Sequence, residues 1–272
     1  MTSEIVDKAG IDVLIPAAGS TLVCANGQHF LVGQPPEVLK GLLRAQINTI
    51  DALVLTDSRA NDGSLLHSVE FMLYHFLFVS EGLKRGERLA LIGRSRAISD
   101  VKRLLKITLL GPDAEQFTTW QTDSSQAAEW LSVSSATALK GKDGSPLTID
   151  DLVSSHPFED NQVQFGDTTI THIEQDCYRF SSGGHDREIR IEADSIRPAY
   201  PLHLDYLAGR LSKFSVEVLG GASGFSPNEP CTGLALCYNG DYVLVDSIPF
   251  LDVHLRARGI AKSQISACYL TH

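Results

Sequence analysis

Residues 56–63, TDSRANDG, carry side chains that could bind a metal ion or an ionic ligand. The carboxylates of Asp57 and Asp62 are ligands that hard cations such as Mg²⁺ or Mn²⁺ prefer. Arg59 lies between them, and a permanent cation repels a metal ion and pairs readily with carboxylates. We therefore favour an Arg–Asp ion pair here over an altered metal site.

Other candidate ligands are scattered along the chain. His272 follows the apolar run 265–271, but a lone histidine binds metal weakly because zinc normally needs three or four preorganised ligands. Asp194 follows a short apolar segment. His172 lies in the alternating run TTITHIE, which is typical of a hydrogen-bonded structural histidine, and His185 lies in SSGGHD, which is typical of a hairpin turn. No spacing joins these residues to one site.

An internal repeat predicts the elements that position these residues. Residues 22–57 align with residues 235–272 at an offset of 212 to 215 positions. Each stretch predicts a strand, an Asn-Gly hairpin turn, a second strand, a Pro-led amphipathic helix and a short apolar strand. The matched positions are Cys24 with Cys237, Asn26-Gly27 with Asn239-Gly240, Pro36 with Pro249, Leu43-Arg44-Ala45 with Leu255-Arg256-Ala257, and Leu55-Thr56 with Leu270-Thr271.

The region between the repeats predicts a mixed, layered α/β fold. We place a domain boundary near residues 213–216, which gives one domain over 1–214 and part of a second over 215–272. The expected helices span 65–79, 99–106 and 203–211, the expected strands span 88–92, 163–165, 168–173, 177–180, 187–193 and 216–220, and residues 133–147 are expected to form a loop.

Composition is that of an ordinary globular protein, with 43% hydrophobic and 21% charged residues. The net charge of −10 argues against a nucleic-acid partner. No apolar run is long enough for a membrane span, and the first residues lack the pattern of a signal peptide, so we expect a cytoplasmic protein without a membrane partner. Five cysteines without a C-x-x-C pair argue against a disulfide framework and a zinc finger.

The second repeat, with the residues before it, resembles the metallo-β-lactamase superfamily. VEVLGGASGFSPNEPCTGLAL (216–236) resembles the glycine-rich first strand and loop of its transfer-RNA-processing and phosphodiesterase branch. YVLVDSIP (242–249) resembles the family strand that ends in an aspartate, here Asp246. ISACYLTH (265–272) resembles the strand that delivers the signature His-x-His-x-Asp-His, of which His272 would be the first histidine.

The resemblance implies that the first repeat has lost the family's metal ligands. In TDSRANDG, Asp57 stands for the first signature histidine, Arg59 for the second, Asn61 for the aspartate and Asp62 for the last histidine. The family aspartate matched by Asp246 is replaced by Gly33. Asp194 resembles a later aspartate ligand of the family.

The resemblance also implies a fold and a function. The fold would be a four-layer αβ/βα sandwich, with two mixed sheets flanked by helices and a metal site along one sheet edge. The parent protein would be a metal-dependent hydrolase of a phosphodiester or related ester, with zinc, iron or manganese in the full-length second domain. We expect no metal and no activity in this chain, because the first site is degenerate and the second stops at His272.

Two alternatives stay open. In the first, the chain is a non-catalytic ligand-binding or sensor module that holds a small-molecule or phosphoester ligand in the old cleft. In the second, Asp57, Asp62 and Asp194 form an altered metal centre. A homodimer is compatible with each of these hypotheses.

Overall fold

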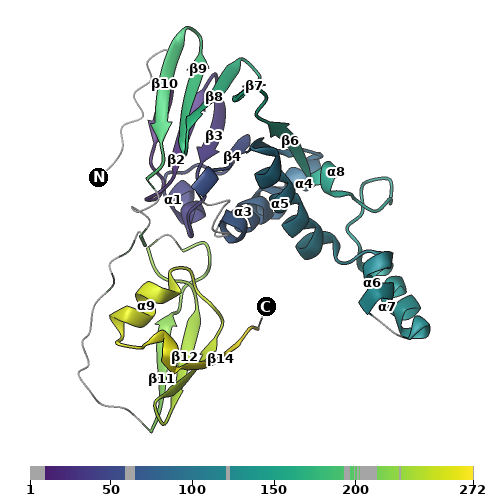
Figure 1. Ribbon diagram of the computed structural model, residues 1–272, viewed down its shortest axis with the longest axis vertical. Coiled ribbons are helices and arrows are strands. Elements are labelled where there is room, and N and C mark those ends of the chain that lie inside the picture. The colour runs from purple at the N-terminus through teal and green to yellow at the C-terminus, as the bar shows by residue number, and fades with distance from the viewer. Residues whose placement is uncertain are drawn as a thin grey trace. The chain divides into compact units, whose positions relative to one another are not determined.

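The computed structural model describes residues 10–58, 65–120, 123–192, 197–198, 200, 202, 213–226 and 228–271 (Figure 1). The chain divides into two compact units. Unit 1 comprises Met1–Leu14, Thr21–Gln34 and Thr49–Ala193, and unit 2 comprises Ile15–Ser20, Pro35–Asn48 and Asp194–His272. The boundary that we placed near residue 214 stays a prediction.

A six-stranded mixed sheet forms the centre of unit 1. Its strands follow the order β1-β2-β3-β4-β5-β6, with antiparallel pairing from β1 to β3 and parallel pairing from β3 to β6. The Asn26-Gly27 turn joins β2 to β3 with φ values of 50° and 72°, as the predicted tight hairpin requires. The strands are β1 (Asp12–Leu14), β2 (Thr21–Ala25), β3 (Gln28–Val32), β4 (Ala52–Val54), β5 (Leu89–Gly93) and β6 (Val153–Pro157).

A second, antiparallel sheet of unit 1 packs on one face of the first. Its order is β10-β9-β8-β7, and the Gly183-Gly184 turn between β9 and β10 confirms the predicted hairpin. Side chains of both sheets share one core, in which Phe30 and Val54 of the first sheet lie with Tyr178 and Phe180 of the second. The strands are β7 (Gln162–Phe165), β8 (Thr168–Glu174), β9 (Cys177–Ser182) and β10 (His185–Arg190).

The helices of unit 1 correct two sequence predictions. The helix expected over 99–106 begins at Ser95 instead, directly after β5, because its buried face already starts at Ala97. The expected loop 133–147 is helical as far as Thr137, since a run of small residues continues the preceding helix. The helices are α3 (Leu65–Tyr74) with the π-helical segment His75–Val79, α4 (Gly82–Arg85), α5 (Ser95–Leu105) with the π-helical segment Lys106–Leu110, α6 (Ala114–Trp120), α7 (Ser124–Thr137) and α8 (Ile149–Leu152).

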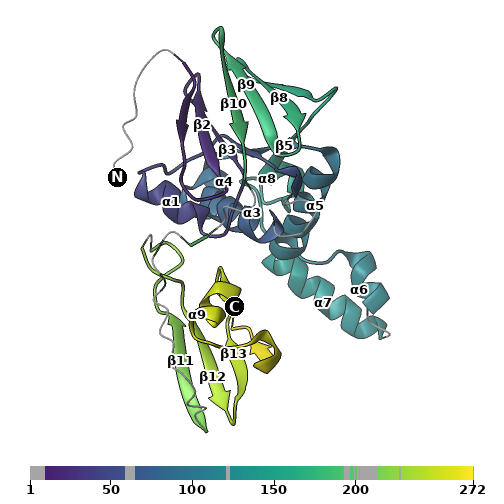
Figure 2. The ribbon, with the colours of Figure 1, turned by 60° about the vertical axis from the view of Figure 1, so that its left-hand side comes forward.

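Unit 2 contains a four-stranded sheet of order β11-β12-β13-β14, with a small apolar core of its own. Its pairing is antiparallel, antiparallel and then parallel, as it is along β1-β2-β3-β4. Figure 2 shows α9 against one face of this sheet. The elements are α1 (Val38–Arg44), β11 (Phe214–Gly220), β12 (Gly233–Tyr238), β13 (Asp241–Val245), α9 (Leu251–Ala257), a 3₁₀ turn (Lys262–Gln264) and β14 (Ile265–Tyr269). The helix expected over 203–211 lies outside the described residues.

Backbone conformations also correspond between the two repeats. Gly33 and Asp246 both have positive φ, at 73° and 62°, and so do Gln46 and Gly259, at 61° and 68°. The last helical turns close alike, with the amide of Ile47 donating to the Leu42 carbonyl and that of Ile260 donating to the Leu255 carbonyl. Leu42, rather than Leu43, therefore corresponds to Leu255, which corrects the sequence alignment of this helix by one residue.

The predicted mixed α/β class is confirmed. Among the described residues, no helix is long and apolar enough to cross a membrane.

Candidate functional site

The candidate site of unit 1 lies where two parallel strands end. Asp57 follows β4, and Arg94 directly follows the neighbouring strand β5. Because the strands are parallel, their carboxyl ends meet at one edge of the sheet, where α/β proteins commonly place functional side chains. His172 reaches the same place from β8 of the second sheet.

Both carboxylate oxygens of Asp57 are engaged by protein groups. Oδ1 accepts a hydrogen bond from Nε of Arg94 at 2.6 Å, and Oδ2 lies 2.6 Å from Nε2 of His172. The side chains of Asp57 and His172 are 12% and 6% exposed, whereas that of Arg94 is 61% exposed. Charge-assisted hydrogen bonds of this kind are about twice as strong as neutral ones, so Asp57 is held firmly in this geometry.

Neighbouring groups fix this arrangement further. Asp176, in the turn after β8, accepts a hydrogen bond from the backbone amide of Ser58 at 3.1 Å. Tyr178 donates to the carbonyl of Leu55 at 3.3 Å, and Phe158 stacks on its ring. Burial, with the carboxylates of Asp57 and Asp176 nearby, raises the pKa of Tyr178 far above its ordinary value, so its hydroxyl stays protonated.

This donor set does not fit a metal ion. A metal would have to displace Arg94 or His172 from Asp57, and the arginine cation would repel it. Within the described part of the chain, no three His, Cys, Asp or Glu side chains gather as a metal would require.

The structure places only some of the predicted site residues. Arg59, Asn61, Asp62 and Asp194 lie outside the described residues. His185 lies at the exposed start of β10.

Among the described residues, Asp57 pairs with Arg94. The expected ion pair with Arg59 stays a prediction, because Arg59 lies outside the described residues. The prediction that His172 is a hydrogen-bonded histidine is confirmed, but its link to Asp57 was missed, as were Arg94 and Asp176. A usable signal for Arg94 was present, because it follows a buried strand just as Asp57 does.

In unit 2, Asp246 is also engaged by the protein. Its two carboxylate oxygens accept hydrogen bonds from the backbone amide and the hydroxyl of Thr271, each at 2.7 Å. Its backbone amide donates to the carbonyl of Tyr269 at 2.9 Å. His272 lies outside the described residues. The described part of unit 2 therefore places Asp246 beside the strand end but does not define a ligand set.

The corresponding place in unit 1 contains a buried hydroxyl without a partner. The amide of Gly33 donates to the carbonyl of Val54 at 3.3 Å, as that of Asp246 does to Tyr269. Gly33 has no carboxylate, and the Oγ1 of Thr56 is buried with no hydrogen-bond partner among the described residues. An unpaired buried hydroxyl costs about 1–3 kcal/mol.

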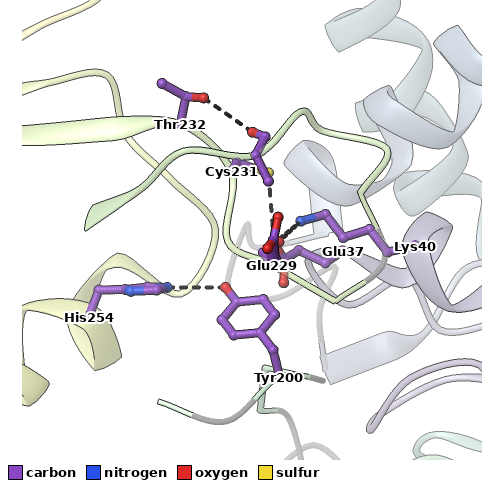
Figure 3. Close-up of polar contacts among 8 residues, drawn as sticks. Glu37, Lys40, Tyr200, Glu229, Cys231, Thr232 and His254 are labelled. Atoms are coloured by element: carbon purple, nitrogen blue, oxygen red, sulfur yellow. Dashed lines mark hydrogen bonds and ion pairs between the residues drawn. The ribbon is translucent and has the colours of Figure 1, made fainter. Parts of the chain in front are cut away.

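A second polar cluster, which the sequence analysis missed, lies inside unit 2 (Figure 3). The Lys40 ammonium, 2% exposed, lies 2.8 Å from Oε1 of Glu37 and donates to the carbonyl of Glu229 at 2.6 Å. Tyr200 and His254 share a hydrogen bond of 3.1 Å nearby. The Lys40 contacts tie α1 to the loop before β12, and the residue of the other repeat that corresponds to Lys40 is Val253. We assign this cluster a structural role.

Comparison with known proteins shows similarity in fold only. No protein-family model and no curated protein matches the chain. Among solved structures, the chain is similar to the metallo-β-lactamase fold protein YhfI from Bacillus subtilis, with 15% identity, coverage of 62% of this chain and 52% of that chain, and a TM-score of 0.33.

Two further solved structures are similar. One is a diphosphatase of the PhnP family, with 15% identity, coverage of 60% and 48%, and a TM-score of 0.31. The other is the short form of human tRNase Z, with 12% identity, coverage of 70% and 69%, and a TM-score of 0.37. The chain spans about half the length of YhfI and of the diphosphatase. At these identities and TM-scores the likeness carries no argument about this chain.

Proposed function

We propose that this chain comes from a metal-dependent hydrolase with two metallo-β-lactamase-like units, acting on a phosphodiester or related ester. Unit 1 is a non-catalytic partner whose former metal site is replaced by an ion pair. Hydrolysis belongs to a second unit that begins with β11–β14, where Asp246 and His272 match the family's motif. Metal-bound water would supply the nucleophile there.

The single observation that carries this proposal is the engagement of Asp57. One oxygen is bound by Arg94 and the other by His172, both at 2.6 Å. In this proposal Asp57, Arg94 and His172 bond to one another in the place where a metal would lie. Asp57 and His172 therefore stabilise the contact between the two sheets of unit 1.

The proposal is tested by assaying hydrolysis of bis(p-nitrophenyl) phosphate with Zn²⁺, Fe²⁺ or Mn²⁺ added. We expect the purified chain to hydrolyse this diester no faster than the metal ion alone, with no change on adding a chelator. The variants to compare are Asp57→Ala and, as a matched control, Asp186→Ala on the exposed strand β10. Chelator-sensitive hydrolysis that Asp57→Ala abolishes and Asp186→Ala retains would show that unit 1 is catalytic.

A further inference from the structure

Positive charge is concentrated in one short segment of this acidic chain. Residues 82–111 contain eight of the 23 Lys and Arg residues but only two of the 33 Asp and Glu residues. This segment therefore carries a formal charge of +6, and the remainder of the chain carries −16. The prediction against a nucleic-acid partner used the net charge of the whole chain, which averages over this asymmetry.

The helix α5 directs part of this positive charge to the surface of unit 1. It packs against β5 and β6 through a buried face that begins at Ala97 (Figure 1). Its opposite face, here named the basic face, is exposed and comprises Arg96, Ser99, Arg103 and Lys106. Spacings of three and four residues place these side chains in one row. The side chains of Arg96 and Arg103 are 92% and 72% exposed, and they lie two helical turns apart, roughly 10 Å along the axis.

Carboxylates near the basic face neutralise it only in part. The two arginines share Asp100, which lies 4.0 Å from Nε of Arg96 and 3.8 Å from Nη2 of Arg103. Exposed ion pairs of this kind contribute only about 0–1 kcal/mol, so a stronger anionic ligand can replace Asp100 at both guanidinium groups. Lys106, by contrast, pairs closely with Asp113 at 2.8 Å. Arg96 and Arg103 are therefore the cations of this face that are best able to bind a ligand.

Other cations extend the row at both of its ends. Arg94 directly precedes α5, and its side chain is 61% exposed while its Nε pairs with Asp57. At the far end, Arg88 donates to the backbone carbonyl of Asp150, and Lys102 binds the carboxylate of the same residue. Among the described residues, the six cations of the row and its ends exceed by two charges the four carboxylates that contact them.

We propose that the basic face of α5 binds the phosphate backbone of a nucleic-acid strand. Guanidinium groups match phosphate oxygens with two parallel hydrogen bonds, and serine hydroxyls such as that of Ser99 also donate to phosphates. The basic face contains no apolar side chain, whereas the centre of a protein–protein interface is apolar. A phosphate backbone therefore suits this face better than an acidic protein does. This ligand goes beyond the proposed function, which assigns no ligand to unit 1.

Fluorescence anisotropy of a labelled single-stranded oligouridylate of about 20 nucleotides tests the proposal, with the full chain in about 50–200 mM NaCl. A chelator is present throughout, so that binding is measured without metal-dependent hydrolysis and its outcome is separate from that of the proposed function. We expect a Kd of roughly 10–100 µM at the lowest salt concentration, which increases steeply as salt is added.

Two double variants separate the basic face from the net charge. Arg96→Glu/Arg103→Glu should weaken binding by at least about tenfold and reduce the slope of log Kd against log salt by about 1–2, because two phosphate contacts are lost. Arg179→Glu/Arg187→Glu, at exposed positions of β9 and β10, is the matched control because it changes the net charge equally. Its Kd should stay within about twofold of the wild-type value, since salt screens distant charges.

If circular dichroism shows that Arg96→Glu/Arg103→Glu fails to fold, Arg96→Gln/Arg103→Gln replaces it and should also weaken binding. Absence of binding by the wild type up to about 100 µM at the lowest salt concentration would overturn the proposal. Equal weakening in the α5 variant and in the control variant would overturn it as well, because net charge alone would then govern binding. A polyglutamate peptide of matched charge that competes as well as unlabelled oligouridylate would assign the face to an acidic protein instead.

Discussion

Gly33 and Asp246 occupy corresponding positions in the two repeats. In each repeat a threonine, Thr56 or Thr271, follows the next strand, and the two threonines have different surroundings. In unit 2, Asp246 accepts two hydrogen bonds from Thr271, whereas the hydroxyl of Thr56 in unit 1 is buried with no partner among the described residues. We therefore expect the lack of a carboxylate at Gly33 to lower the stability of unit 1 through the Thr56 hydroxyl.

This difference predicts opposite effects for one substitution made at two places. Thr56→Val replaces an unpaired hydroxyl with a methyl group of similar size and should raise the free energy of unfolding by about 1 kcal/mol. Thr271→Val removes a hydrogen bond to Asp246 at an exposed site and should lower it by about 0.5–1 kcal/mol. Urea denaturation of both variants measures the two signs, and a lower stability for Thr56→Val would contradict this account.

His254 predicts a pH dependence of stability. Its burial, followed by the nearby charge of Arg258, lowers its pKa to about 4. Between this pKa and the unfolded value near 6.5, the unfolded state binds a proton that the native state excludes. The contribution of His254 to the free energy of unfolding is therefore fully present above about pH 6.5. It falls by up to about 3 kcal/mol as the pH decreases towards 4.

The variant His254→Leu should reduce the slope of unfolding free energy between pH 6.5 and 4.5. The pKa values of His75 and His156 are lowered by burial too, so a smaller slope of the same sign should persist. His185→Leu, at an exposed position, serves as the control and should keep the wild-type slope. Identical slopes in His254→Leu and the wild type would show that His254 does not cause the pH dependence of stability.

At the scale of elements, the glycine pair after β11 has a specific packing role. A Cβ atom added at Gly220 would lie 2.2 Å from the carbonyl oxygen of Cys231, whereas one added at Gly221 would meet nothing within 4 Å. The glycine-rich run of 220–224 therefore lets two backbone segments approach closely.

Replacing each of these glycines with alanine tests this role. Gly220→Ala should lower the melting temperature strongly, because the backbone carbonyl of Cys231 cannot move away without breaking the local pairing. Gly221→Ala should leave the free energy of unfolding within about 0.5 kcal/mol of the wild-type value. The measurement is thermal denaturation of both variants, and equal effects would show that the close approach does not govern stability.

Elements were predicted from sequence where local pattern decides them. The two Asn-Gly hairpins and the strands of the second sheet could be read from turn residues and alternation. The start of α5 could not, because Ser99 has the chemistry of a cap, yet burial of Ala97 and Ile98 against the fold starts the helix earlier. Local propensity gives way to packing there.

The site was less predictable than the elements for a related reason. Asp57 and His172 are 115 positions apart, and only the packing of one sheet on the other brings them together. Arg94 lies beside Asp57 because β5 pairs with β4, and no spacing in the sequence specifies that pairing. Residue types therefore indicated ion pairing at Asp57, whereas its actual partners depended on tertiary structure.

For the whole molecule, the central claim of the proposed function is that the Asp57 site of unit 1 binds no metal. The sheet order and core of unit 1 position Asp57, Arg94 and His172 at the strand ends, where they satisfy each other. The described residues of unit 2 repeat the same strand pairing around Asp246. Under the proposed function, metal-dependent hydrolysis belongs to the second unit.

Metal content, measured by elemental analysis after dialysis against Zn²⁺ or Mn²⁺, tests this claim most directly. The chain should carry His272→Ala, so that only unit 1 is examined. We predict less than about 0.1 metal ion per chain, because zinc needs three or four ligands. In unit 1, Asp57 is already bonded to Arg94 and His172. About one ion per chain, lost in Asp57→Ala but retained in Asp186→Ala, would contradict the account.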